Sequence, residues 1–131
     1  MTTHVTETPA AASDDALRHF GDMLAFETDC WDVHEGLKAP NPDFVLVDVR
    51  GPNAFAKAHV NGAINIPHRE MTAKRMSQHP KNKVFVVYCA GPHCNGANKA
   101  AVQLARLGLP VKMMIGGVTG WIDEGFALTS V

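Results

Sequence analysis

The sequence predicts a single α/β domain with a central, mostly parallel five-stranded sheet and helices on both faces. Two apolar, β-branched runs at 44–49 and 84–89 indicate interior strands, because neither run alternates apolar with polar residues. Helical stretches separate the strand candidates, and this alternation is typical of a parallel sheet. With 131 residues, 46% of them hydrophobic, the chain is long enough for one domain with a substantial core.

The other elements follow from shorter patterns along the chain. Shorter or edge strands are expected at 24–26, 63–66 and 111–115, the last before a Gly116-Gly117 turn. Helices are expected at 29–37 with Thr28 as N-cap, at 53–58, at 70–78 and at 97–107. Residues 1–13, rich in Thr, Ala and Pro, are expected to form a flexible tail, and residues 14–131 the domain.

Charge and cysteine content narrow the class of protein. The net charge of -1 gives no global attraction to nucleic acid or membrane, and neither partner is expected. Ten acids and two bases lie in residues 1–48, whereas residues 49–122 hold one acid and ten bases. A site built from the second stretch should therefore favour small anions, unless the acidic first third folds back and neutralises it. The odd number of cysteines, three, and the absence of a secretory pattern predict reduced thiols and a cytoplasmic location.

The loop after the second strong strand carries the most chemical information. It reads YCAGPHCNGANKAA from residue 88, and it places Cys89 between a strand end and a helix start. Backbone amides and the helix dipole at such a turn stabilise anions, so Cys89 is expected to ionise more readily than a free cysteine. From these residues alone, Cys89 could be a nucleophile, half of a redox pair, a metal ligand or a buried thiol.

The residues around Cys89 weigh against phosphatase chemistry and against a metal site. A cysteine phosphatase needs an arginine in the loop to bind phosphate, and no arginine lies between Cys89 and Lys99. Cys89, His93 and Cys94 do not have the spacing of a zinc site and have no evident fourth ligand, so no metal is expected.

Four motifs together resemble the rhodanese family, over nearly all of residues 24–128. They are FVLVDVRGPNAFAKAHVNGAINIP, VVYCAGPHC, ANKAAVQLARLG and MIGGVTGWIDEGFAL. The resemblance implies a sulfurtransferase in which Cys89 takes a sulfane sulfur from a small donor anion and passes it, as a persulfide, to a thiol acceptor or a sulfur-relay protein. It implies no cofactor. The substrate loop would comprise Ala90, Gly91, Pro92, His93, Cys94, Asn95 and Gly96, with His93 as a modulator.

The match also assigns supporting roles. Asp48 and Arg50, at the end of the first strong strand, are expected to hold the floor of the site together. His59 and Trp121 match structural positions of the family, and Cys30 is expected to be inert packing.

The loop departs from the common rhodanese pattern in one respect. It is about two residues longer, and Cys94 stands where an arginine often lies; this resembles a subgroup with the pattern Cys-x-Gly-Pro-x-Cys, some members of which are attached to winged-helix regulators. Thiosulfate is therefore in doubt as the favoured donor. Two alternatives stay open, a redox or persulfide-sensing module that uses Cys89 and Cys94, and a weakly catalytic adaptor that binds a partner. The sequence predicts no oligomeric state.

Overall fold

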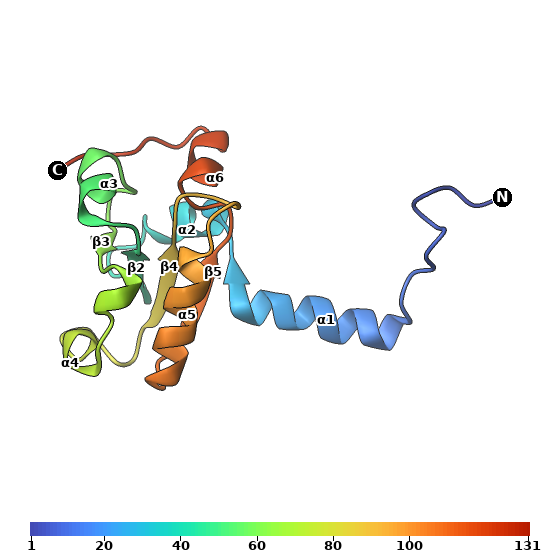
Figure 1. Ribbon diagram of the computed structural model, residues 1–131, viewed down its shortest axis with the longest axis horizontal. Helices are drawn as coiled ribbons and strands as arrows, with labels where there is room; N and C mark the ends of the chain where they lie inside the picture. The colour runs from blue at the N-terminus through green and yellow to red at the C-terminus, as the bar shows by residue number, and fades with distance from the viewer.

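The computed structural model describes residues 1–131 and contains one sheet of five strands, each parallel to its neighbours. The strands are β1 Glu27–Thr28, β2 Phe44–Asp48, β3 Ile64–Asn65, β4 Val84–Tyr88 and β5 Val111–Met114. Their order across the sheet is β1-β5-β4-β2-β3. The predicted fold class is confirmed, and β4, which leads into the cysteine loop, is the central strand (Figure 1).

Six α-helices and one 3₁₀ turn connect and cover the strands. They are α1 Ser13–Phe26, α2 Cys30–Gly36, α3 Pro52–Lys57, η1 His68–Glu70, α4 Ala73–Met76, α5 Gly96–Arg106 and α6 Gly117–Asp123. The predicted helices at 29–37 and 97–107 agree with α2 and α5 to within one residue at each end. No helix in the chain combines the length and apolar character needed to cross a bilayer.

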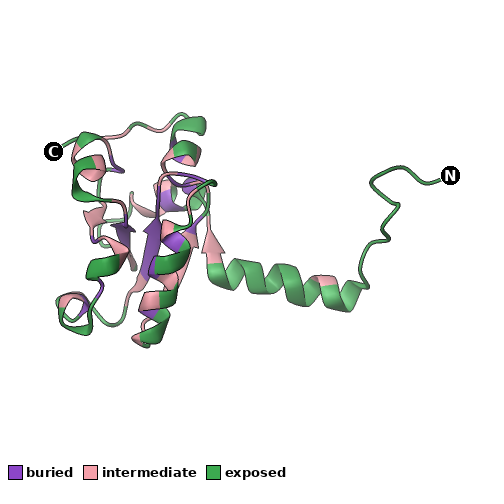
Figure 2. Ribbon diagram, viewed as in Figure 1, coloured by how far each residue is buried: buried purple, intermediate pink, exposed green.

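Two hydrophobic clusters, one on each face of the sheet, form the core, and the central strands are buried between them (Figure 2). Successive residues of a strand point to opposite faces. Val87 and Cys89 therefore belong to the cluster that contains the buried residues of α5, whereas Tyr88 belongs to the cluster that contains those of α2 and α6. This alternation places the Cys89 side chain on the α5 face of the sheet.

Helix α1 differs from the sequence prediction. A strand was expected at 24–26, but those residues continue α1, and β1 begins only at Glu27. Apolar residues at helical spacing, among them Leu17, Phe20 and Leu24, explain why the segment is helical, and Asp14 and Asp15 complement the dipole of its first turn. The helix leads away from the packed layers, and none of its residues is buried (Figure 1).

Two smaller predictions are also corrected. The helix expected at 70–78 is split into η1 and α4, because Thr72 is extended and its side chain accepts a hydrogen bond from the amide of Arg75 at 3.1 Å, which starts a new helix. The N-cap of α2 is Asp29 rather than Thr28, since an Asp29 carboxylate oxygen accepts from the Asp32 amide at 2.8 Å.

Candidate active site

The loop from Cys89 to Asn95 crosses the carboxyl end of the central strand and enters α5 (Figure 1). Ligands of open parallel sheets bind at this end of the strands. Within the loop, the amide of Cys94 donates to the carbonyl of Gly91 at 3.1 Å, which closes a tight turn through Pro92 and His93. The loop therefore has a defined shape, and its two cysteines lie on either side of that turn.

The start of α6 anchors the loop through backbone hydrogen bonds. The amides of Val118 and Thr119 donate to the carbonyls of Cys89 and Ala90 at 3.1 and 3.0 Å. Gly117 has a φ of 57°, and a Cβ there would collide with the Cys89 carbonyl oxygen, so the close approach of the two segments requires glycine. These bonds direct the loop carbonyls away from the cysteines and leave amides on their side.

Amides near the sulfurs are the donors that an anion cradle would use. Those of Ala90 and Gly96 lie close enough to the two cysteine sulfurs to act toward a lower pKa at each. The other free amides are those of Gly91, His93, Asn95, Ala97 and Asn98, none of which donates to a backbone carbonyl. An electron-rich sulfur at the mouth of this loop would therefore meet several donors and the positive end of the α5 dipole.

Cys89 and Cys94 face each other at the start of α5. Both sulfurs converge on Gly96, where a Cβ would lie 2.8 Å from the Cys89 sulfur and 3.5 Å from the Cys94 sulfur. Cys89 is 7% exposed, whereas Cys94 is half-buried. The Cys94 sulfur also accepts a hydrogen bond from the Gly96 amide at 3.5 Å.

The two thiols differ in acidity, and not as the sequence predicted. Burial, and then the hydrogen bond to Cys94, raise the pKa of Cys89, so the expectation that Cys89 ionises more readily than a free cysteine is wrong for this arrangement. The hydrogen bonds from Cys89 and from the Gly96 amide lower the pKa of Cys94. The surroundings of Cys94 therefore favour its thiolate and those of Cys89 favour its thiol, and the two groups titrate as a pair.

The predicted supporting residues lie at and just after the end of β2, where Asp48 is paired in register with Tyr88 of β4. Asp48 is fully buried, and Arg50 clamps it with two side-chain donors, Nε to Oδ1 at 3.0 Å and Nη2 to Oδ2 at 2.7 Å. The Arg50 amide adds a third bond to Oδ1 at 3.0 Å. This is a structural ion pair at the end of β2, next to the strand that carries Cys89.

Other residues singled out in the sequence are structural. A His59 ring nitrogen makes a 2.6 Å hydrogen bond with the Phe55 carbonyl oxygen, and the Trp121 indole donates to the Ala127 carbonyl at 3.0 Å. Cys30 is buried in the α2–α6 cluster, and burial raises the pKa of its thiol to about 11. No group of three His, Cys, Asp or Glu side chains in the chain is placed to hold a metal ion.

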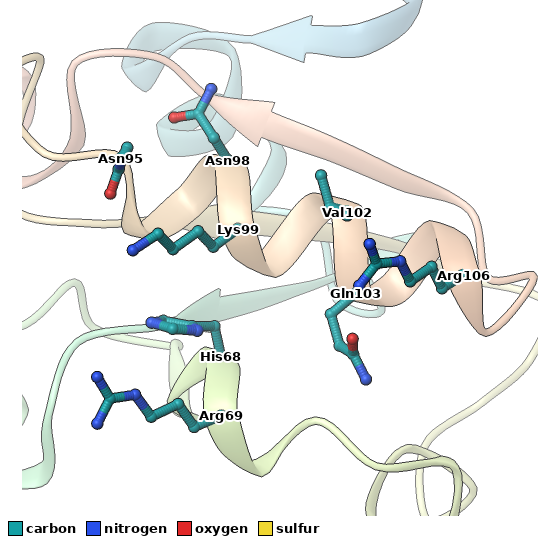
Figure 3. Close-up of a pocket in the computed structure, with 8 residues that line it drawn as sticks. All are labelled: His68, Arg69, Asn95, Asn98, Lys99, Val102, Gln103 and Arg106. Carbon is teal, nitrogen blue, oxygen red and sulfur yellow. The ribbon is translucent and has the colours of Figure 1, made fainter.

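The surface around the loop contains one feature that the sequence analysis did not assign. A basic cleft between η1 and α5 is lined by His68, Arg69, Lys99 and Arg106, together with Asn95, Asn98, Val102 and Gln103 (Figure 3). The excess of bases in residues 49–122 was the signal for it, but that excess could not show which bases converge.

The comparison with protein families decides the identity of the fold. The sequence profile of the rhodanese-like domain matches residues 31–124. The chain belongs to the rhodanese family. As a rhodanese-like domain it carries Cys89 in the loop between the central strand and α5, as the sequence motifs predicted; the narrower Cys-x-Gly-Pro-x-Cys subgroup stays a prediction.

Individual relatives agree with this placement. A crystal structure of a Bacillus halodurans protein is 36% identical, with a TM-score of 0.87 over 91% of this chain and 87% of that one. A sulfurtransferase of Allochromatium vinosum is 30% identical over 95 residues, which are 70% of this chain and 84% of that protein. An HTH-type transcriptional regulator of Mycobacterium tuberculosis is 37% identical over 90 residues, 63% of this chain. The chain spans only 39% of that regulator's length.

Proposed function

We propose that this rhodanese-like domain is a sulfurtransferase in which Cys89 carries the transferred sulfur as a persulfide. The observation that carries the proposal is the position of the Cys89 sulfur, which lies against Gly96 at the N-terminus of α5, where the Ala90 and Gly96 amides act to lower its pKa. The same donors would stabilise the outer sulfur of a persulfide, which is anionic near neutral pH. The sulfurtransferase name of the Allochromatium vinosum relative supports the same class of activity.

The reaction has two steps. The Cys89 thiolate attacks the sulfane sulfur of a donor R–S–SH, so that a new S–S bond forms on Cys89 and the old one breaks to release the thiolate RS⁻. An acceptor thiolate then attacks the outer sulfur of the persulfide, and Cys89 leaves as a thiolate. No external oxidant or reductant is consumed, and no cofactor is needed because the persulfide itself stores the sulfur.

Cys94 is suited to remove the proton from Cys89. Its surroundings lower the pKa of its thiol, and its sulfur faces that of Cys89 at Gly96. Transfer of the Cys89 proton to the Cys94 thiolate would give the Cys89 thiolate without exposing it to bulk water. A base of this kind also needs a compartment in which both cysteines stay reduced, such as the cytoplasm.

The donor is better matched by a persulfide than by thiosulfate. Leaving sulfite carries two negative charges, and residues 89–98 contain no Arg or Lys to bind them. A loop of neutral amides and one histidine suits a thiolate leaving group, which carries a single charge.

A second candidate function, a thiol redox switch, is favoured by the contact between the two cysteines. Attack of the Cys94 thiolate on the inner sulfur of a Cys89 persulfide would form a Cys89–Cys94 disulfide and release hydrogen sulfide. Under this alternative, exposure to a persulfide donor leaves a protein that has lost two hydrogens and gained no sulfur. Replacing Cys94 by Ser then converts that product into a stable persulfide.

Turnover measurements test the proposal. The purified protein is given a persulfide donor and a thiol acceptor, and the release of the donor thiol is followed. We expect Cys89→Ser to lose at least about a hundredfold in rate, since the step has no other carrier. Cys30→Ser is the matched control, because that cysteine lies in the α2–α6 cluster, and it should keep its rate. Slow transfer by the unaltered protein would favour the adaptor role instead.

A further inference from the structure

The basic cleft beside the loop lies between two walls, one from η1 and one from α5. His68 and Arg69 of η1 form one wall, and Lys99, Val102 and Arg106 of α5 form the other (Figure 3). The Gln103 side chain donates to the Met71 carbonyl at 3.0 Å and so ties α5 to the segment that follows η1. The cleft encloses ≈ 480 Å³, a volume within the range of small-molecule sites.

The positive charges of the cleft are not neutralised within the protein. Arg69, Lys99 and Arg106 form no ion pair, and no carboxylate lines the cleft. The one acid in this part of the chain, Glu70, pairs with Arg75 at 3.8 Å instead. Three permanent cations and a histidine gathered in one concave surface attract a ligand with more than one negative charge.

The cleft is continuous with the cysteine loop. Asn98 lines three adjoining hollows: the basic cleft, an open hollow that also contains His93 and Cys94, and a smaller one that contains Cys89 and Cys94. Asn95 is shared by the first two. A ligand held in the basic cleft can therefore extend over Asn95 and Asn98 toward the two sulfurs.

We propose that the basic cleft is the binding site for the carboxylates of a low-molecular-weight persulfide or thiol, whose sulfur reaches the Cys89–Cys94 pair. This inference rests on the proposed sulfurtransferase function and specifies its substrate as a molecule with at least two carboxylates. Arginine side chains at positions 69 and 106 offer planar donor pairs that match carboxylate geometry. Seven of the eight lining residues are polar, which excludes an apolar chain as the occupant.

Binding without turnover is the first test. S-methylglutathione carries two carboxylates but has no free thiol or persulfide, so its affinity, measured by calorimetry, reports the cleft alone. We expect the Arg69→Gln/Arg106→Gln double variant to bind it at least about tenfold more weakly, because two charge-assisted contacts are lost. Lys74→Gln is the matched control, since Lys74 is exposed, lies on α4 outside the cleft and forms no ion pair. Equal affinity in all three proteins, or no binding to the wild type, overturns the inference.

Kinetics with two donors is the second test. Glutathione persulfide carries carboxylates, and the persulfide of 2-mercaptoethanol carries none. The double variant should raise KM for the first donor by about tenfold with little change in kcat, and leave kinetics with the second donor unchanged. An equal loss with both donors overturns the inference.

The two tests separate this inference from the function it depends on. If neither donor adds sulfur to Cys89 in the wild type, the sulfurtransferase proposal fails, and the inference fails with it. If both donors add sulfur equally well to the wild type and to the double variant, the sulfurtransferase proposal stands and only the carboxylate site is wrong.

Discussion

The Cys89 and Cys94 sulfurs converge on Gly96, so a more buried cysteine, whose pKa is raised, is paired with a more exposed one, whose pKa is lowered. Sequence spacing alone favoured a single activated cysteine. The structure instead gives the two residues different surroundings. Those of Cys94 favour its thiolate, and Cys89 lies where the loop would enclose a persulfide.

This division predicts the pH dependence of thiolate formation. In the wild type the first thiolate should appear below the usual cysteine pKa of about 8.5, because Cys94 titrates first. In Cys94→Ser only the buried Cys89 remains in the loop, and its transition should lie above that value, since burial opposes charge. Thiolate absorbance against pH measures both, and Cys30, with a pKa of about 11, stays protonated over the range of interest. An unchanged transition in Cys94→Ser would show that Cys89 is the acidic thiol.

A second prediction concerns the space at Gly96. An alanine Cβ there would lie 2.8 Å from the Cys89 sulfur, closer than atoms of this kind approach. We expect Gly96→Ala to slow alkylation of Cys89 and sulfur uptake by roughly tenfold or more, while the gain in helix propensity, about 1 kcal/mol, preserves stability. Gly21→Ala is the control, because nothing lies within 4 Å of its added Cβ. Unimpaired sulfur uptake by Gly96→Ala would mean that the cysteine sulfurs lie elsewhere during the reaction.

The Asp48–Arg50 ion pair gives a prediction about stability. Asp48→Ala removes a fully buried carboxylate and leaves the Arg50 guanidinium unpaired. The free energy of unfolding should fall by about 3 kcal/mol, at the lower end of the effect of breaking a buried pair, because Arg50 keeps some contact with water. Urea unfolding measures this loss. Glu35→Ala, which breaks the exposed Glu35–Lys38 pair, should change the unfolding midpoint little. Similar midpoints for the two variants would argue against a structural role for Asp48.

Helix α1 gives a prediction of the opposite kind. None of its residues is buried. An exposed hydrogen bond, from the Lys112 ammonium to the Leu24 carbonyl at 2.9 Å, links α1 to the sheet. A chain that begins at Phe26 should therefore unfold with a free energy within about 1 kcal/mol of the full chain. In contrast, Leu104→Ala in α5 should cost about 2–5 kcal/mol, since Leu104 is fully buried. A large loss of stability on removing α1 would show that its apolar face is covered in solution.

The sequence was most informative where local pattern and tertiary burial agree. The runs at 44–49 and 84–89 are apolar on both faces, so they could be read as interior strands, and the turn after each one placed Cys89 and the Asp48–Arg50 pair at the same end of the sheet. Pattern failed at 24–26, where three apolar residues resemble a short strand but continue the helical spacing from Leu17. The prediction of one helix over 70–78 failed because Thr72 can start a helix as well as lie inside one.

The site could be predicted only in part. Spacing identified Cys89 and its loop, but the pKa values of Cys89 and Cys94 depend on burial and on the approach of the two thiols, which no linear pattern encodes. The basic cleft has Arg69 of η1 on one wall and Arg106 of α5 on the other, and only the packing of η1 against α5 brings the two walls together.

Intact-protein mass spectrometry after brief exposure to glutathione persulfide tests the central claim most directly. The wild type and Cys94→Ser should each gain the mass of one sulfur atom, and Cys89→Ser should gain none. Loss of two hydrogens by the wild type with no retained sulfur would favour the redox switch over sulfur transfer, and sulfur retained by Cys89→Ser would contradict a persulfide carried on Cys89.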